Sequence, residues 1–379
     1  MRTVKHLAYL VAFCAPVLFF SCTKNIDQVA PAATGPVATV TPKKALTSGG
    51  YSNGFFLINE GWFSHGTGEV NFYSYATGTL QDSIFGANNP GKNLNPATST
   101  LEFGTIFNGQ LYLVSKVGGP LVVTDPTTLV ESNRIAASST RDWRAFVGVD
   151  ATHGLVSSQT GIFPLALPAL TVGAKLAGPS ISGQVGDMIL SGNYVFALSA
   201  TSGVVVINAS THAIAKTIAG MVVGFTKTSD GTVWAAGGTS LLKIDPTTLD
   251  TATIALPFTV NSSWDAWHPG SITASTSENA VFIANNGTFT GGTTIYKYIV
   301  GTPSSVASPF ITINSGDELY GSGIGYDASN NTLVVTTVQS GGLNNYSVND
   351  LDIYNAGTGS LISDLNYSGF WFPAIAVFH

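Results

Sequence analysis

Large aromatic side chains, several with a charged neighbour, occur where predicted strands end and in the segments that connect them. Aromatic rings provide a wide, stiff contact surface at low entropic cost, so a group of them suits a bulky, partly apolar ligand or a protein partner. The densest group lies at residues 264–268. Any one of these rings could instead have a purely structural role, covering one end of the hydrophobic core. The candidate ligand-binding residues are Trp62, Phe63, Trp143, Arg144, Trp264, Asp265, Trp267, His268, Tyr320, Trp371 and Phe372.

Catalytic and metal-binding patterns are much weaker in the sequence. The six histidines show no metal-ligand spacing, and no cysteine is placed to complete a zinc site. Asp317 and Glu318, with Asp265 and Glu60, could supply acid–base chemistry or bind calcium, although adjacent loop carboxylates are more often simply solvated. The glycine-rich stretch at 321–325 leads into a strand, so no helix N-terminus is available there for a phosphate. We expect no catalytic residues, no metal and no cofactor, and a protein that is not an enzyme.

Charge is sparse along the chain. Lys and Arg number 15 against 21 Asp and Glu, and charged residues make up 9% of the sequence. A protein that binds nucleic acid needs a basic stripe to neutralise phosphates, so nucleic acid is excluded as a partner. The 42 glycines and the 44% hydrophobic content favour many short strands joined by tight turns.

Residues 1–22 have the pattern of a lipoprotein signal peptide. Arg2 and Lys5 precede an apolar run at 7–20 that is too short to span a membrane, and the run is followed by Ser21 and Cys22. A small residue directly before a cysteine is typical of the bacterial lipobox, at which the signal is cleaved and Cys22 receives lipid. A plain secretory signal is the alternative. We expect a protein of the outer membrane, anchored by lipid alone and exposed at the cell surface, with the periplasmic side as the alternative.

Residues 23–53 predict a flexible tether. They are rich in Pro, Ala, Thr, Ser and Gly and cannot bury enough apolar surface to fold. The folded domain is therefore expected at 54–379.

A recurring turn reveals repeats within this domain. The sequence Asp-Pro-Thr-Thr-Leu at 125–129 returns unchanged at 245–249, and looser copies occur at 75–78, 208–211 and 355–358. An Asp or Asn that opens a turn can bond the backbone two residues further on, and Pro presets the next φ angle. Each copy is preceded by short apolar runs with the alternation of β-strands.

Repeats of roughly 40 to 50 residues built from four strands are typical of propeller blades. Six such repeats are expected at 101–136, 143–176, 184–218, 221–255, 269–312 and 321–365. The chain start supplies three more strands, at 55–59, 69–75 and 79–85, and the chain end supplies one at 372–378. Joined together, these four strands would close the ring without an unpaired edge. The predicted fold is all-β, a seven-bladed β-propeller; six blades or a pair of sandwiches are the alternatives.

Connection lengths distinguish the two faces of such a ring. Connections between strands one and two and between strands three and four of a blade lie on one face, and we expect them to be minimal. The other connections lie on the opposite face, the long-loop face, which is the expected binding face because binding residues concentrate in long loops on a rigid scaffold. The long connections are predicted at 60–68, 86–100, 256–268, 286–292, 314–320 and 338–348.

The motif Leu-Ile-Asn-Glu-Gly-Trp-Phe at 57–63, followed by Gly-Glu-Val-Asn-Phe-Tyr at 68–73, resembles the opening of a family of bacterial cell-surface propeller lipoproteins. This family is related to YncE-like and amine-dehydrogenase-like propellers. Some of its members sit over outer-membrane transporters and capture vitamin B12. The resemblance therefore implies a corrinoid as ligand and an outer-membrane transporter as partner.

Together these patterns indicate an outer-membrane lipoprotein that binds a ligand on the long-loop face, such as a corrinoid or a similar bulky nutrient captured for a transporter. One alternative is an adhesion or assembly role, in which the same face docks a protein or a glycan. Another is a propeller enzyme, because the fold does not determine the function.

Overall fold

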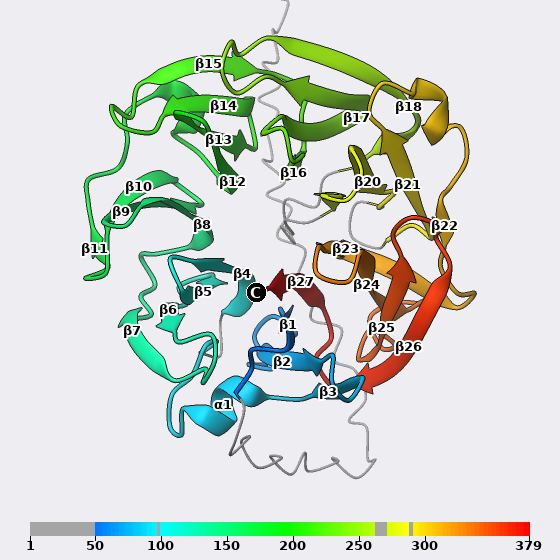
Figure 1. Ribbon diagram of the computed structural model, residues 1–379. Helices are drawn as coiled ribbons and strands as arrows, with labels where there is room; N and C mark the ends of the chain where they lie inside the picture. The colour runs from blue at the N-terminus through cyan, green and yellow to red at the C-terminus, as the bar shows by residue number, and fades with distance from the viewer. Residues whose placement is uncertain (1–49, 97–98, 262–270, 288–290) are drawn as a thin grey trace, which may run out of the picture. The chain divides into compact units, whose positions relative to one another are not determined.

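The computed structural model describes residues 50–96, 99–261, 271–287 and 291–379 (Figure 1). The predicted signal peptide, Cys22 and nearly all of the predicted tether lie outside these ranges. Seven antiparallel sheets stand in a ring, each with one strand near the centre and the others following outward (Figure 1). The predicted seven-bladed β-propeller is confirmed.

The first four blades each contain four strands. Blade 1 consists of β27 (Pro373–Phe378), β1 (Gly54–Asn59), β2 (Glu69–Ser74) and β3 (Thr79–Gln81). Blade 2 consists of β4 (Thr100–Phe107), β5 (Gln110–Lys116), β6 (Leu121–Thr124) and β7 (Glu131–Ile135). Blade 3 consists of β8 (Trp143–Asp150), β9 (His153–Ser158), β10 (Gly161–Ala166) and β11 (Thr171–Val172). Blade 4 consists of β12 (Val185–Ser191), β13 (Tyr194–Ser199), β14 (Gly203–Asn208) and β15 (Ile214–Ile218).

The other three blades complete the ring. Blade 5 consists of β16 (Val223–Lys227), β17 (Val233–Ile244) and β18 (Thr251–Val260). The first part of β17 pairs with β16 and its second part pairs with β18, so this one element takes the place of two strands. Blade 6 consists of β19 (Ile272–Ala274), β20 (Ala280–Ala284), β21 (Thr294–Ile299) and β22 (Ile311–Thr312). Blade 7 consists of β23 (Asp317–Asp327), β24 (Thr332–Gln339), β25 (Val348–Asn355) and β26 (Leu361–Ser368).

The C-terminal strand closes the ring. β27 pairs antiparallel with β1 from Phe55 opposite Phe378 to Asn59 opposite Pro373. This places Ile375 opposite Ile58, which confirms the predicted joining of the two chain ends in blade 1. Closure leaves no inner sheet edge unpaired at the point where the chain begins and ends.

Neighbouring blades share hydrophobic cores. Side chains alternate between the two faces of a strand, and both faces of a blade are covered. In β1, Phe55 and Leu57 pack toward blade 7, whereas Phe56 and Ile58 pack toward blade 2. This double burial explains why the inner strands are nearly continuous apolar runs.

The repeated Asp-Pro-Thr-Thr-Leu turn has one structure in both copies. The Oδ1 atom of Asp125 accepts hydrogen bonds from the backbone N–H groups of Thr127 (2.8 Å) and Thr128 (2.9 Å). Its backbone carbonyl accepts a third bond, at 2.8 Å, from the residue four positions on. Three further turns follow this scheme, opened by Asp245, Asn208 and Asn355. The predicted side-chain-to-backbone bonding of these turns is confirmed.

The predicted strand at 79–85 is wrong beyond Gln81. There the chain turns into a short helix, α1 (Ile84–Asn88). Two side chains of β2 hold it: Asn71 Oδ1 accepts a hydrogen bond from the Ser83 N–H at 3.0 Å, and Glu69 Oε2 accepts one from the Gly86 N–H at 3.2 Å. These partners are remote in sequence, so the strand-like pattern of the segment could not indicate them.

The expectation of minimal connections on the face opposite the long-loop face also needs correction. The connection between β21 and β22 covers 300–310 and contains a 3-10 helix, η3 (Pro303–Val306). Val306 is buried in the core shared by blades 5 and 6, so the longer connection contributes to that core. A second 3-10 helix, η1 (Pro179–Ile181), lies between blades 3 and 4. None of the described helices is long and apolar enough to cross a membrane.

The closing strand provides a test of the fold. We predict that Val377→Ala in β27 lowers the free energy of unfolding by about 2 kcal/mol, because it deletes buried methyl groups and leaves a cavity. Ile362→Ala, in the outer strand β26 at a side chain that is 58% exposed, should change it by less than about 0.5 kcal/mol. Urea denaturation measures both variants. An equal loss in the two would contradict the role given to β27.

Candidate functional site

The inner strands of several blades are interrupted at the same place, close to the long-loop face. In β4, Glu102 is an extra residue between the pairs Leu101–Ser115 and Phe103–Val114. Corresponding register shifts occur near the starts of β8, β12, β16 and β27. A β-bulge bends the strand and redirects a side chain, and bulges are common at the rims of barrels and beside active sites. The repeated bulges therefore mark this end of the central axis as the candidate site.

Three of these bulges contain a buried charged residue. They are Glu102 in blade 2, Arg144 in blade 3 and Asp187 in blade 4. Charged side chains are almost never buried without a partner, because removing a charge from water is costly. Each of the three must therefore have a dedicated partner.

Glu102 is paired through Lys116. The Nζ atom of Lys116 lies 2.7 Å from Glu102 Oε2 and 2.6 Å from Oε1 of Glu60, in the connection between β1 and β2. Glu102 is fully buried, and its Oε1 has no hydrogen-bond partner among the described residues. A lysine from blade 2 thus links a carboxylate of its own blade to one of blade 1.

Burial shifts the pKa values of Glu60, Glu102 and Lys116. It raises the pKa of Glu102 to about 7, opposed by the charge of Lys116 and assisted by that of Glu60. Burial likewise raises the pKa of Glu60, against the same ammonium. Burial alone lowers the pKa of Lys116, but the two carboxylates outweigh it and the pKa is raised. Lys116 therefore stays charged at neutral pH, while Glu102 is close to its titration point.

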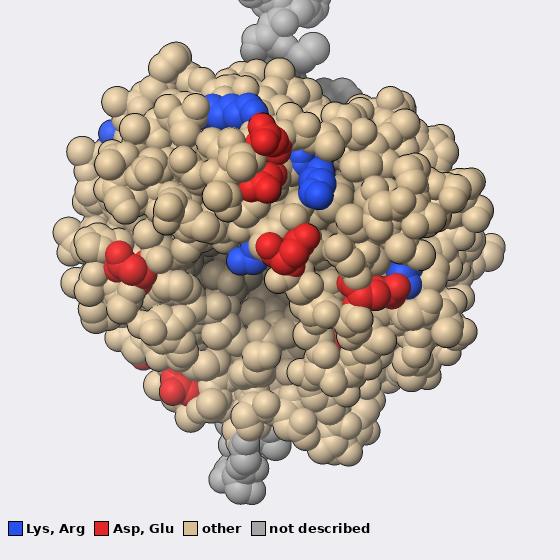
Figure 2. Space-filling view, turned by 45° about the horizontal axis from the view of Figure 1, so that its top comes forward, with Lys and Arg blue, Asp and Glu red and all other residues tan. Residues whose placement is uncertain are grey.

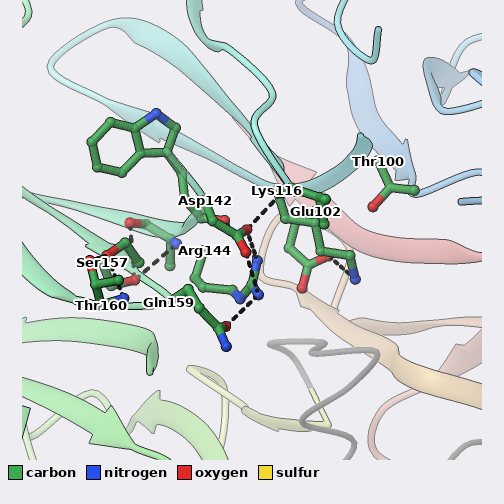
Figure 3. Close-up of polar contacts among 12 residues, drawn as sticks. Thr100, Glu102, Lys116, Asp142, Arg144, Ser157, Gln159 and Thr160 are labelled. Atoms are coloured by element: carbon green, nitrogen blue, oxygen red, sulfur yellow. Dashed lines mark hydrogen bonds and ion pairs between the residues drawn. The ribbon is translucent and has the colours of Figure 1, made fainter. Parts of the chain in front are cut away.

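Arg144 has its partners within blade 3 (Figure 3). Its guanidinium forms an ion pair with Asp142 and donates a hydrogen bond to Gln159 Oε1 at 2.8 Å. Asp142 also accepts a hydrogen bond from the backbone N–H of Val117 at 2.6 Å, which ties blade 3 to blade 2. We call the five residues Glu60, Glu102, Lys116, Asp142 and Arg144 the charged cluster.

Asp187 uses backbone partners instead. Its Oδ2 accepts a hydrogen bond from the N–H of Phe225 in blade 5, and its Oδ1 accepts one from Met188, both at 2.8 Å. Burial nevertheless raises its pKa to about 6. The blade 4 bulge therefore joins neighbouring blades rather than presenting a charge to a ligand.

Aromatic rings gather beside the charged cluster, where blades 1 and 7 meet. We call them the rim cluster: Trp62, His65, Tyr320, Tyr346, Trp371 and Phe372. The partly exposed part is a stack in which the ring centroid of Trp62 lies 3.6 Å from that of His65 at an interplanar angle of 7°, and 4.2 Å from that of Trp371 at a tilt of 33°. The buried part stacks Tyr320 on Phe372 with ring centroids 4.2 Å apart. The rim cluster is therefore exposed to solvent on one side and buried on the other.

Two observations connect the clusters. The backbone N–H of Glu60 donates a hydrogen bond to the carbonyl of Phe372 at 2.6 Å. Burial, and then the charges of Glu60 and Glu102, raise the pKa of Tyr320. The Tyr320 phenol therefore stays neutral at neutral pH.

Trp371 is held in a strained conformation. Its φ of 63° lies in the left-handed region, which bulky residues rarely adopt and which costs of order 1–3 kcal/mol. The fully buried Asn349 stabilises this conformation by donating hydrogen bonds to the carbonyls of Trp371 (3.0 Å) and Tyr346 (3.2 Å). Such strain persists where the surroundings impose it, as at ligand sites.

The structure brings together four of the predicted site residues: Trp62, Tyr320, Trp371 and Phe372. Phe63 follows Trp62 in the chain and is 51% exposed, whereas Tyr320 and Phe372 are buried. Trp143 and Arg144 lie in β8 and are also buried; Trp143 packs in the core between blades 2 and 3, with Phe163 against its ring. The remaining four, Trp264, Asp265, Trp267 and His268, lie outside the described residues.

Sequence reasoning missed Glu102, Lys116 and Asn349. A signal was present for the first, because a single carboxylate interrupts the apolar run of β4. Lys116 ends the apolar β5 in the same way. Asn349 gave no signal, because its role is to hydrogen-bond the carbonyl of Trp371, and the sequence does not show that the two residues meet.

Charged side chains are few and scattered on the face shown in Figure 2, which is hollowed at the centre of the ring. This agrees with a composition of 9% charged residues and leaves the buried charged cluster as an unusual concentration. Within the described ranges, no group of three or more His, Cys, Asp or Glu side chains is placed to hold a metal ion.

Lys116 provides a direct test of the charged cluster. We predict that Lys116→Met lowers the free energy of unfolding by about 3–5 kcal/mol, because it leaves two carboxylates buried without a cation. Lys175→Met, at an exposed lysine, should change it by less than about 0.5 kcal/mol. Adding Glu60→Gln and Glu102→Gln to Lys116→Met should recover most of the loss. Failure of this combined variant to recover stability would contradict the pairing.

The raised pKa of Glu102 predicts a pH dependence of stability. Protonated Glu102 stabilises the fold fully below its ordinary pKa of 4.5, and this contribution disappears as the pH rises through about 7. The free energy of unfolding should fall over that interval. Glu102→Gln, which cannot ionise, should show a smaller fall, with the buried Asp187 contributing part of the remainder. Identical pH profiles, measured by denaturation from pH 4.5 to 8, would refute the assignment.

Several solved structures share this fold. A quinonprotein alcohol dehydrogenase-like protein from Bacteroides thetaiotaomicron VPI-5482 is 18% identical with a TM-score of 0.69, over 87% of this chain and 79% of that one. The dihydro-heme d1 dehydrogenase NirN, in complex with DHE, is 12% identical with a TM-score of 0.53, over 89% and 77%. The extracellular domain of a proposed one-component system from B. thetaiotaomicron is 13% identical with a TM-score of 0.51, over 71% and 34%. At these identities the likeness establishes the fold alone.

Among curated protein sequences, none matches this chain. The model of one protein family does match, over residues 53–379, and covers the whole of the described propeller. That family is described as "Domain of unknown function (DUF5074)". The chain therefore belongs to the DUF5074 family.

Proposed function

We propose that this protein is a lipid-anchored propeller of the outer membrane that captures a bulky, partly apolar ligand on its long-loop face. The observation that carries the proposal is the partly exposed stack of His65, Trp62 and Trp371. Aromatic rings that are partly exposed to solvent offer apolar contact surface to a ligand. The strained backbone of Trp371, whose carbonyl accepts a hydrogen bond from Asn349, supports a binding role, because such strain clusters at ligand sites.

A binding role fits the charged cluster better than a catalytic one. Catalytic acids and bases must reach the reacting atoms. Glu102 and Lys116 are buried and engaged with each other, and Arg144 is buried and engaged with Asp142. The charged cluster therefore has a structural role: through Glu60 it positions the connection between β1 and β2, which carries Trp62.

A corrinoid is the first ligand to test. The family resemblance of residues 57–63 and 68–73 implies it, and a bulky ligand with apolar edges matches the partly exposed aromatic rings. On this proposal the partner is an outer-membrane transporter that receives the ligand.

The proposed location rests on the N-terminal pattern that ends in Cys22. It is supported by one solved structure of similar fold, the extracellular domain of a proposed one-component system from B. thetaiotaomicron. Lipidation of Cys22 would hold the propeller at the membrane through the segment 23–53.

Calorimetric titration of the lipidated protein with cyanocobalamin tests the proposal. We predict binding, and a loss of about tenfold in affinity for Trp62→Ala, because the central ring of the stack is removed. His153→Ala, on the opposite face with an exposed side chain, should bind like the wild type. If the wild-type protein did not bind cyanocobalamin, a corrinoid would be ruled out as the ligand. If Trp62→Ala bound it with the affinity of the wild type, the rim cluster would be ruled out as the site.

A further inference from the structure

A second concave site lies on the long-loop face between blades 2 and 3, built from residues outside the rim cluster. It is a cleft of about 400 Å³, a size common for small-molecule sites. It is lined by the turn between β5 and β6, the loop between β7 and β8, and one residue before β4. Its lining includes Val117, Gly118, Ser138, Ser139, Arg141 and Asp142.

The cleft has one uncompensated charge. Of its two charged residues, Asp142 is already neutralised by its ion pair with Arg144, and it also accepts the Val117 N–H. Arg141 forms no ion pair with any described residue. Its guanidinium carbon lies 5.8 Å from the centre of the Trp143 ring, so the ring supports the cation from one side. The free donors of Arg141 remain available to an anion.

The loop that carries Arg141 is anchored at its base. The N–H of Ser138 donates to the Gly118 carbonyl at 2.8 Å, and the N–H of Arg141 donates to the Ser138 carbonyl at 2.9 Å. Ser138 Oγ lies 2.9 Å from Thr140 Oγ1, and Ser139 is exposed beside it. Hydroxyl groups therefore line the same cleft as the arginine, on a loop that backbone hydrogen bonds hold in place.

The opposite wall is strained. Val117 has a φ of 52°, and a β-branched residue in the left-handed region is an outlier. The hydrogen bond from its N–H to Asp142 maintains this conformation. Strained residues of this kind cluster at ligand-binding sites.

We propose that this cleft binds the carboxylate of a small hydroxylated acid, such as a sugar acid. Arg141 provides the single positive charge, which matches one carboxylate, and its planar fork can donate two parallel hydrogen bonds to it. Ser138 and Ser139 bond the hydroxyl groups of the ligand. This site is independent of the corrinoid proposal, because it shares no residue with the rim cluster.

Calorimetry with D-glucuronate, and with D-glucose as the neutral match, tests the inference on the full chain. Glucuronate should bind, and glucose at least about tenfold more weakly. Arg141→Gln should weaken glucuronate binding by about tenfold or more and leave glucose unaffected, whereas Arg141→Lys should keep part of the affinity. Binding should weaken as salt is added.

Two matched variants sharpen the test. Arg134→Gln removes an arginine that pairs with Glu131 outside the cleft and should bind glucuronate normally. Trp62→Ala should also bind it normally, which separates this site from the rim cluster. Because Arg141 has no ion pair in the described chain, Arg141→Gln should melt like the wild type. No binding of glucuronate, equal binding of glucose, or unchanged binding by Arg141→Gln would each overturn the proposal.

Discussion

The pairing of β27 with β1 is the interaction on which the other features depend. Without it, blade 1 would lack its inner strand and present an open edge to the centre of the ring. The same pairing builds the candidate site, because Trp371 and Phe372 directly precede β27. Closing the ring brings these residues, from the end of the chain, against Trp62 and Glu60 from its start.

The bulges of the inner strands show how a repeated scaffold acquires specific chemistry. A blade needs only apolar residues on both faces of its inner strands to pack against its neighbours. At the bulge, one residue leaves the strand pairing, and blades 2, 3 and 4 use it for Glu102, Arg144 and Asp187. Each charge is satisfied differently, by a lysine, by an aspartate with a glutamine, or by backbone N–H groups. Neighbouring blades are joined at these points as well as through their shared cores.

The predictive power of the sequence was highest where the interactions are local. Asp125 and Asp245 bond the backbone within their own turns, so their sequence motif was enough to predict the turn and the repeat. The segment 82–88 shows the limit, because its helix depends on Glu69 and Asn71 in another strand. For the site, aromatic residues in loops predicted the rim cluster in part, but not its division into an exposed stack and a buried half.

The sequence by itself determined the class of fold and the number of blades, because strand alternation and turn chemistry act between residues close together along the chain. It determined the closure of the ring through the strand count, because three strands at the chain start and one at the chain end complete a four-stranded blade. Only the tertiary structure decided that Lys116 lies between Glu60 and Glu102, that Asn349 supports Trp371, and that Arg141 remains without an ionic partner among the described residues. These features depend on which strand ends meet in space and on how far burial removes each charge from water. Neither quantity is a property of a short stretch of sequence.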